Sequence, residues 1–286
     1  HRDFVSGLDA LIDAQIPIIW TLHNLMPHEP KDPQMEARLR HDIAQRATLI
    51  HIMNPKTVEL AKGLYELPAD KVRLIPHPSY VGVYPNLIEP LEARSRLGIA
   101  GNSLSFLFLG GIRPYKGIEQ LLDAFDVLSQ RRDDVSLAVA GKPGRFPGVD
   151  ELEARCLSNP RIVSRFESVP ADQIQLWMNA ADVVVLPHER SLNAGSLHLA
   201  YAFGRPVVAS RAAVHAAEVD EQCTILFDWD PRGENLLEAM AQADRLANDL
   251  ARRAAFTLGQ AHDMITVSAA FRSIVEEARS IVGSVE

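Results

Sequence analysis

The sequence predicts an α/β protein with two doubly wound domains, of which the first is incomplete. Three observations support this fold class. Short apolar runs of strand length alternate with segments of helical periodicity along most of the chain, as in the βαβ units of parallel sheets. A proline-rich stretch at 76–86 interrupts the alternation, and a second series begins after it. The first series is short, because the residues before strand 17–22 leave room for about one helix.

The first domain is predicted to span residues 1–92. We expect strands at 17–22, 48–53 and 72–75 and helices at 4–14, 33–46 and 55–65. Asp32 followed by Pro33 is typical of a helix start, since Asp caps free N–H groups and proline suits the first helical position. The stretch 76–86 should be irregular, and the domain junction should fall near 88–95.

The second domain is predicted to span residues 93–262. We expect strands at 104–109, 136–140, 161–164, 182–186, 206–209 and 224–227, and helices at 117–130, 150–157, 171–180 and 195–203. Such a series makes a complete nucleotide-binding domain. Long helical segments at 231–258 and 260–283 follow, and Asp230 should cap the first of them.

Composition and charge narrow the class of protein. A chain of 286 residues that is 47% hydrophobic can bury the cores of two domains. Its net charge of −8 disfavours nucleic acid as a partner, and its apolar runs are shorter than the ~20 residues that cross a bilayer. Cys156 and Cys223 lie far apart, and the histidines lack ligand spacing. We therefore expect a cytoplasmic protein without a metal or another cofactor.

The most informative motif is Leu-Gly-Gly-Ile-Arg-Pro-Tyr-Lys-Gly-Ile at 109–118, between a predicted strand and a predicted helix. Gly110 and Gly111 let backbone N–H groups approach an anion, while Arg113 offers a planar fork of donors and Lys116 a point charge. Lys142, in a turn after the next strand, could join these cations. A diphosphate would fit this loop, although the alternative is a plain glycine turn with solvated cations.

A second constellation follows the strand at 182–186. Gly195 and Ser196 open a predicted helix, where free N–H groups and a hydroxyl can receive phosphate oxygens. Glu189 and Ala194 lie in the loop before it. The alternative is an ordinary capped helix without a ligand.

Several histidines and tyrosines follow strands of the first domain. His23 stands directly after strand 17–22 and His28 further along the same loop, whereas His77 and Tyr80 follow strand 72–75. These side chains could contact a sugar or an acceptor hydroxyl. A histidine at a strand end is, however, more often structural, and a tyrosine in a proline-rich loop can serve as packing.

These motifs, in this order, resemble the retaining glycosyltransferases of family 4, which have the GT-B fold of two Rossmann-like domains. In this chain Arg113 stands three positions before Lys116, and the loop is similar to that of one sub-group of the family. Many other members carry the arginine where this chain has Gly111. The resemblance implies transfer of a sugar from a nucleotide-diphosphate donor to a hydroxyl acceptor, in polysaccharide or glycan biosynthesis. It also implies that helix 263–286 crosses back onto the first domain.

The resemblance assigns roles to the candidate residues. Those implied to be catalytic are His23, Arg113 and Lys116, and those implied to bind the donor are Gly110, Gly111, Arg113, Lys116, Lys142, Glu189, Ala194, Gly195 and Ser196. The side chains implied to face a glycan or lipid-linked acceptor are His28, His77 and Tyr80. Such an acceptor would allow a weak peripheral contact with the inner face of the membrane.

Two positions depart from the family pattern. The family usually carries two glutamates eight positions apart, and alignment on Ala-x-Ala-x-Gly-x-Pro-Val-Val places Ser191 and Leu199 there. Neither supplies a carboxylate, so the sugar and the base of the donor stay open. A second hypothesis is therefore a nucleotide-sugar-binding module with impaired catalysis. A nucleotide-sugar epimerase on the same fold is disfavoured, because such enzymes usually use several acidic residues that this sequence does not display.

Overall fold

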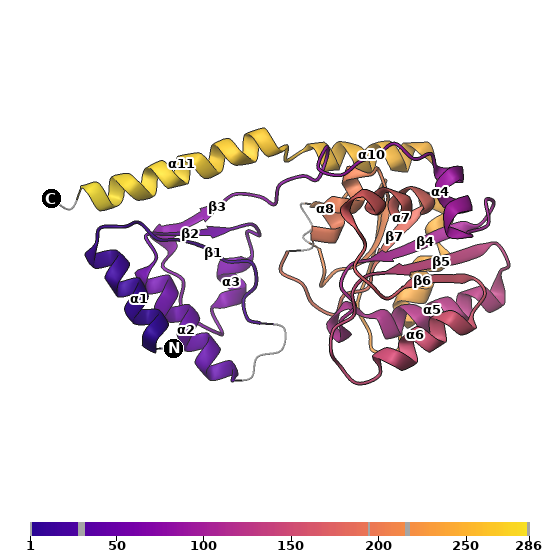
Figure 1. Cartoon of the computed structure of the whole chain (residues 1–286), viewed down its shortest axis with the longest axis horizontal. Coiled ribbons are helices and arrows are strands. Elements are labelled where there is room, and N and C mark those ends of the chain that lie inside the picture. The colour runs from indigo at the N-terminus through magenta and orange to yellow at the C-terminus, as the bar shows by residue number, and fades with distance from the viewer. Residues whose placement is uncertain (1, 28–31, 194, 215–217, 285–286) are drawn as a thin grey trace. The chain divides into compact units, whose positions relative to one another are not determined.

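The computed structural model describes residues 2–27, 32–193, 195–214 and 218–284 (Figure 1). Its contacts divide the chain into two compact units. The first unit comprises residues 1–78 and 262–286, and the second unit comprises residues 79–261. Both are built on parallel sheets, as the fold class predicted.

The first unit contains a three-stranded parallel sheet in the order β1-β2-β3. Its strands are β1 (Ile19–Thr21), β2 (Leu49–Ile52) and β3 (Val72–Leu74), and its helices are α1 (Arg2–Asp13), α2 (Pro33–Arg46), α3 (Thr57–Ala61) and α11 (Met264–Gly283). Side chains alternate across β2, because successive residues of a strand point to opposite faces. Ile50 and Ile52 join one apolar cluster, while Leu49 packs with Ile274 of α11 on the other face.

Local signals account for the ends of two helices in this unit. The Asp32 side chain accepts a hydrogen bond from the Met35 N–H, and Pro33 is the first residue of α2, as predicted. Asp263 caps α11 in the same way. An ion pair between Arg73 and Glu277 joins β3 to α11, so the carboxyl-terminal helix belongs to the first unit.

The second unit contains a six-stranded parallel sheet in the order β6-β5-β4-β7-β8-β9. Its strands are β4 (Leu104–Leu109), β5 (Val135–Ala140), β6 (Ile162–Arg165), β7 (Val183–Leu186), β8 (Val207–Ser210) and β9 (Thr224–Phe227). Its helices are α4 (Pro90–Leu97), α5 (Ile118–Arg131), α6 (Val149–Ser158), α7 (Ile174–Ala180), α8 (Gly195–Ala202), α9 (Glu234–Ala241) and α10 (Asp249–Gln260).

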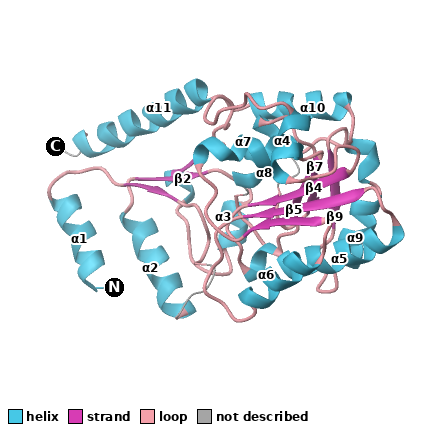
Figure 2. Cartoon of the chain, turned by 45° about the vertical axis from the view of Figure 1, so that its right-hand side comes forward, coloured by secondary structure: helices cyan, strands magenta, loops and turns pink. Residues whose placement is uncertain are grey.

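Helices cover both faces of this sheet (Figure 2). Residues of α5, α6 and α9 form one buried cluster with the strands, and residues of α4, α7, α8 and α10 form another. β4 runs through the centre and contributes Phe106 and Phe108 to the first cluster and Leu107 and Leu109 to the second. Burial on both faces explains why this strand is a continuous apolar run.

The junction between the units differs from the sequence prediction. Residues 79–92 belong to the second unit, whereas the sequence placed them in the first domain. Asn179 donates hydrogen bonds to Asn86 and to the carbonyl of Ile88, which ties this segment to α7. The helix α4 was not predicted, although Pro90 at its first position and Gly98 in a left-handed conformation after it are ordinary start and stop signals.

The predicted helix 231–258 is also wrong, because two shorter helices occupy this stretch. α9 ends at Ala241, a short 3₁₀ turn spans Ala243–Leu246, and α10 begins after Asn248, whose side chain accepts from the Ala251 N–H. Asp230 does accept hydrogen bonds from the first N–H groups of α9, as expected, although Gly233 occupies the N-cap position.

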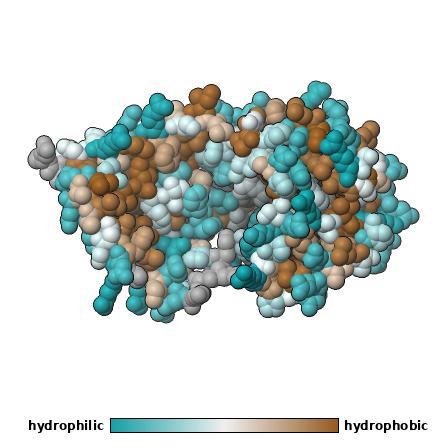
Figure 3. Space-filling view, in the orientation of Figure 1, coloured by the Kyte–Doolittle hydropathy of each residue, from teal (hydrophilic) through white to brown (hydrophobic). Residues whose placement is uncertain are grey.

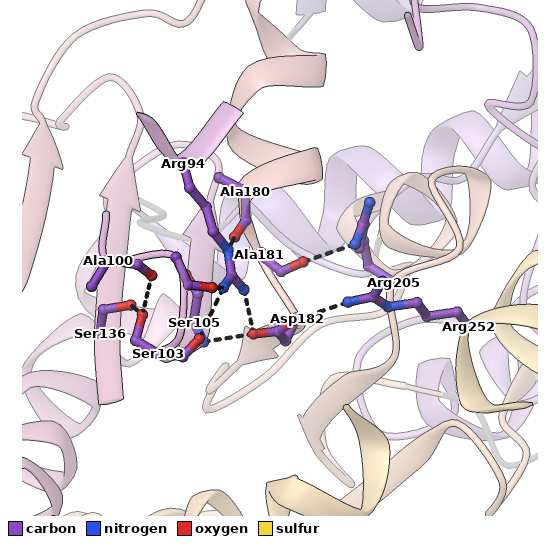
Figure 4. A network of polar contacts seen from close by, with 11 residues as sticks. Arg94, Ala100, Ser103, Ser105, Ser136, Ala180, Ala181, Asp182, Arg205 and Arg252 are labelled. Atoms are coloured by element: carbon purple, nitrogen blue, oxygen red, sulfur yellow. Dashed lines mark hydrogen bonds and ion pairs between the residues drawn. The ribbon is translucent and has the colours of Figure 1, made fainter. Parts of the chain in front are cut away.

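A buried network of charges joins four elements at the amino-terminal edge of the second sheet (Figure 4). Asp182, directly before β7, accepts from the Arg94 guanidinium at 2.5 Å, from Arg252 at 2.9 Å and from the Ser105 N–H at 2.9 Å. Arg205 donates to the Ala181 carbonyl, and burial lowers its pKa to about 10. The network therefore stabilises the edge opposite to the one that carries the candidate site.

Candidate functional site

The predicted donor-binding residues follow three neighbouring strands. β5, β4 and β7 are adjacent and parallel, and the described loop residues after them are 141–148, 110–117 and 187–193. Because the carboxyl ends of parallel strands meet at one edge of a sheet, the three loops emerge together. This is the edge at which ligands bind in open α/β sheets.

In the loop after β4, the lysine folds back over a glycine. Gly110 has a φ of +145°, and a Cβ built on it would lie 3.3 Å from the Lys116 Nζ. Burial lowers the pKa of Lys116, and the neighbouring Arg113 lowers it further. An anion bound here would stabilise the charged ammonium, because its opposite charge compensates for the lost hydration of Lys116 and for the repulsion from Arg113.

The arginine is held across the turn that follows β5. Its Nη1 donates to the Ile112 carbonyl at 2.8 Å and to the Lys142 carbonyl at 3.2 Å. Its stem lies against Gly144, where an added Cβ would meet the Arg113 Cδ at 2.8 Å. The backbone of Lys142 thus supports Arg113, while the Lys142 side chain itself is exposed.

The loops after β4 and β5 touch through their glycines. Gly141 has a φ of +153°, and a Cβ on it would lie 1.7 Å from the Gly110 carbonyl oxygen. Only glycine permits such a close approach of two backbones. This contact holds the turn after β5, which includes Lys142, against the loop that carries Arg113 and Lys116.

The loop after β7 joins the same assembly. The Glu189 N–H donates to the Tyr115 carbonyl at 2.8 Å, and a Cβ on Gly117 would lie 2.0 Å from the Pro187 carbonyl oxygen. The Glu189 side chain is exposed. Gly195 and Ser196 are half-buried in the first turn of α8 at this edge, whereas Ala194 lies outside the described residues.

The two positions that depart from the family pattern have different surroundings. The Ser191 N–H donates to the Ala212 carbonyl at 3.0 Å, and Leu199 packs against the apolar cluster beneath α8. Beside Leu199, the buried His198 has its Nε2 3.5 Å from a carboxylate oxygen of Glu218. Glu218 was not singled out from the sequence, because it stands far along the chain in no recognisable motif.

The first unit places its histidines at the carboxyl-terminal edge of the three-stranded sheet. His23 is exposed directly after the buried Leu22, and His77 is half-buried with its Nδ1 2.8 Å from the Pro78 carbonyl oxygen. Sequence reasoning missed His51, which lies buried in the central strand between the two. Its position inside an apolar strand gave no functional signal. His28 lies outside the described residues.

Tyr80 is half-buried, so part of its ring stays accessible. It belongs to the second unit and packs with Tyr84, at a ring-centroid distance of 5.9 Å, against the apolar cluster of that unit. Burial raises the pKa of Tyr80. Its role toward an acceptor stays a prediction.

The described residues contain no cluster of three or more histidine, cysteine or acidic side chains arranged to hold a metal ion. Within the same residues, none of the helices has the length and apolar character required to span a membrane. The face shown in Figure 3 mixes hydrophilic and hydrophobic residues.

Comparisons with known proteins point to one family. The family model described as "Glycosyl transferases group 1" matches residues 103–245. The GDP-mannose:glycolipid 4-beta-D-mannosyltransferase of Xanthomonas campestris pv. campestris is 30% identical over 207 residues, which cover 72% of this chain and 53% of that protein. The D-inositol 3-phosphate glycosyltransferase of Arthrobacter sp. (strain FB24) is 27% identical over 269 residues, covering 88% and 63%. This chain thus spans a little over half of these relatives.

Solved structures share the fold. Anabaena HepE, in complex with UDP and glucose, has a TM-score of 0.75 at 20% identity, covering 96% of this chain and 74% of that one. The sucrose-phosphate synthase of Thermosynechococcus elongatus has a TM-score of 0.78 at 16% identity, covering 93% and 69%. The chain therefore belongs to the glycosyl transferases group 1 family and has the α/β fold with parallel sheets of the GT-B glycosyltransferases.

Proposed function

We propose that this protein transfers a sugar from a nucleotide-diphosphate donor to a hydroxyl acceptor, in polysaccharide or glycan biosynthesis. The carrying observation is the pair of cations held in one glycine-rich assembly, with Lys116 folded over Gly110 and Arg113 fixed on the Lys142 carbonyl. When the bond between the sugar and the diphosphate breaks, negative charge grows on the leaving phosphate. Preorganised cations stabilise that charge, so the proposal requires no metal or other cofactor.

The partners are proposed from chemistry and from the relatives. The name of the Xanthomonas relative specifies GDP-mannose and a glycolipid, and the HepE structure holds UDP. Both nucleotides share a diphosphate, which is the part that the cations would grip. We therefore assign a nucleotide-diphosphate sugar as donor and a glycan or lipid-linked hydroxyl as acceptor. Transfer would take place in the cytoplasm, and a lipid-linked acceptor would bring the protein to the inner face of the membrane.

Calorimetry with UDP and GDP tests the donor site. Each cation that forms a charge-assisted hydrogen bond contributes about 1.5–3 kcal/mol, so an Arg113→Ala, Lys116→Ala variant should bind at least about 100-fold more weakly. Arg131→Ala removes an exposed cation at the far end of α5 and is the matched control. Wild-type affinity in the double variant would refute the assignment.

We further propose that transfer proceeds with retention, the leaving phosphate taking the acceptor proton on the same face of the sugar. This needs no second carboxylate, in keeping with Ser191 and Leu199. NMR spectroscopy of donor and product compares the configuration of their anomeric carbons. A product with the opposite anomeric configuration to the donor would exclude this mechanism and make His23 the candidate base. The name of the Xanthomonas relative specifies a 4-beta-D linkage, so the configuration of the product has to be measured.

A second candidate function is a nucleotide-sugar-binding module with impaired catalysis. The observation that favours it is the absence of a carboxylate at Ser191 and at Leu199, the latter packed into the apolar cluster. Tight binding of a nucleotide sugar without any glycosylated product, over a panel of glycan and glycolipid acceptors, would support the module. Turnover would support the transferase.

A further inference from the structure

We propose that His51 is a positioning residue for sugar transfer, holding the loop that carries His23 through both its ring and its backbone. The proposal rests on the proposed function, with His23 as the side chain of the first unit that contacts the sugar or the acceptor hydroxyl during transfer. It concerns residues of the first unit, whereas Arg113 and Lys116 lie in the second unit. The two units therefore supply independent readouts.

His51 bonds to both neighbouring strands at the points where they end. In the register of β1 and β2, Thr21 stands opposite His51, and the Thr21 hydroxyl oxygen lies 3.3 Å from the His51 Nδ1. On the other side, the His51 Nε2 lies 3.0 Å from the Ile75 carbonyl oxygen. The His51 carbonyl itself accepts from the Leu22 N–H at 2.9 Å.

These three bonds reach the residues directly before two candidate loops. Leu22 immediately precedes His23, and Ile75 stands two residues before His77. One residue in the central strand thus bonds to the ends of both β1 and β3, from which the two loops begin. A shift of about 1 Å in such a loop can lower turnover 100-fold.

The hydrogen-bond partners fix one of the two ring nitrogens. The Ile75 carbonyl oxygen only accepts, so a proton lies on Nε2, whereas the Thr21 hydroxyl can either donate to Nδ1 or accept from it. Burial lowers the pKa of His51, and the nearby His23 lowers it further. The lowered pKa favours the neutral ring, in which Nε2 donates to Ile75 and Nδ1 accepts from the Thr21 hydroxyl.

The surroundings argue against simple packing as the reason for a histidine here. His51 is 7% exposed and shares its face of β2 with Leu49, which packs with Ile274 of α11. The ring of Phe271 meets it edge-on at a centroid distance of 5.4 Å. An apolar side chain would suit this setting without burying two polar nitrogens. What the imidazole adds is the pair of directed bonds to the two neighbouring strands.

Three variants separate positioning from stability. His51→Phe preserves bulk and removes both ring bonds, and Thr21→Val removes only the hydroxyl. The matched control is Thr48→Val, which removes the bond from the Ile18 N–H to the Thr48 hydroxyl, 3.0 Å long, at the opposite end of β1. We expect kcat to fall about 10- to 100-fold in His51→Phe and several-fold in Thr21→Val, with unchanged affinity for UDP or GDP. Thr48→Val should keep the wild-type kcat.

Two further measurements make the outcome decisive. In a double-mutant cycle, His51→Phe should lower kcat no further once His23→Ala is present, because no catalytic imidazole remains to be positioned. The ring resonances of His23 in NMR spectra should also shift in His51→Phe and stay in place in Thr48→Val, whether or not turnover is detected. His51→Gln, which can still donate to Ile75, should restore part of the lost kcat.

The outcomes are distinguishable. If His23→Ala lowers kcat but His51→Phe does not, the positioning role is wrong and the proposed function stands. If His23→Ala has wild-type kcat, both the role of His23 and the positioning role fail. A loss of kcat in Thr48→Val equal to that in His51→Phe, or unchanged His23 resonances in His51→Phe, would also overturn the inference.

Discussion

Replacing Gly141 by alanine tests whether the close approach of the loops after β4 and β5 builds the diphosphate cradle, by which we mean the site formed by Gly110, Arg113 and Lys116. A Cβ at this position would lie 1.7 Å from the Gly110 carbonyl oxygen and 2.6 Å from its carbonyl carbon, whereas ordinary contact begins at 3.4 Å. The loops after β4 and β5 would have to separate by roughly 1.5 Å, because neither partner is a flexible side chain.

The expected magnitudes follow from this geometry. Overpacking costs about 1–3 kcal/mol, and a positive φ of +153° adds about 1–2 kcal/mol for a residue with a Cβ. In a domain of this size the melting temperature should fall by roughly 5–15 °C. Since Lys116 lies over Gly110, the same shift should weaken diphosphate binding at least about 10-fold, by displacing a cation about 1 Å from its ligand.

Differential scanning calorimetry and titration with UDP or GDP measure the two effects. Gly101→Ala is the matched control, because its nearest neighbour is the Leu91 Cδ2 at 3.7 Å, an ordinary contact. It should keep both the melting temperature and the affinity. A Gly141→Ala variant that binds diphosphate and melts like the wild type would show that the close approach of the loops is not needed for the cradle.

Three further predictions concern charges. Asp182→Asn should destabilise the protein by about 3–5 kcal/mol in urea unfolding, because it leaves the buried guanidinium of Arg94 without its carboxylate. Asp133→Asn, at an exposed side chain, should change little. Burial lowers the pKa of Lys116, so the affinity for UDP should begin to fall at a lower pH than it would with an ordinary lysine. Lys116→Arg should keep its affinity in that pH range, because arginine stays charged. If wild type and Lys116→Arg lose affinity at the same alkaline pH, the assignment is wrong. Arg73 lowers the pKa of Glu277, so the stability that this ion pair contributes is present above the ordinary glutamate pKa and is lost as pH falls through the lower folded pKa. Glu277→Gln should therefore increase hydrogen exchange in α11 at pH 7 but not in strong acid. Exchange at pH 7 equal to that of the wild type would contradict this link.

Much of the fold could be read from local patterns. The strands 104–109 and 224–227 and the helix 33–46 were predicted with the bounds that the structure has. Hydrophobic periodicity and the residues at helix ends act over a few neighbours along the chain, so the sequence displays them directly. The error at 231–258 has the same origin, because a break at Gln242 shows no proline or glycine.

The candidate donor loop was also visible in the sequence, because its glycines and cations lie within a short stretch after a strand. By itself, the sequence determined which residue types could meet a diphosphate there and that two series of βα units carry them. It could not show what lies beside them. β4 lies between β5 and β7 in the sheet, although β7 follows β4 only after two other strands along the chain.

Only the tertiary structure decided that Gly141 approaches Gly110, that Glu218 meets His198, and that the His51 ring spans from Thr21 to Ile75. Each of these contacts joins residues at least 20 positions apart. The order of strands in a sheet and the packing of helices on it bring such residues together, and no short-range pattern of hydrophobicity or turn residues encodes that order.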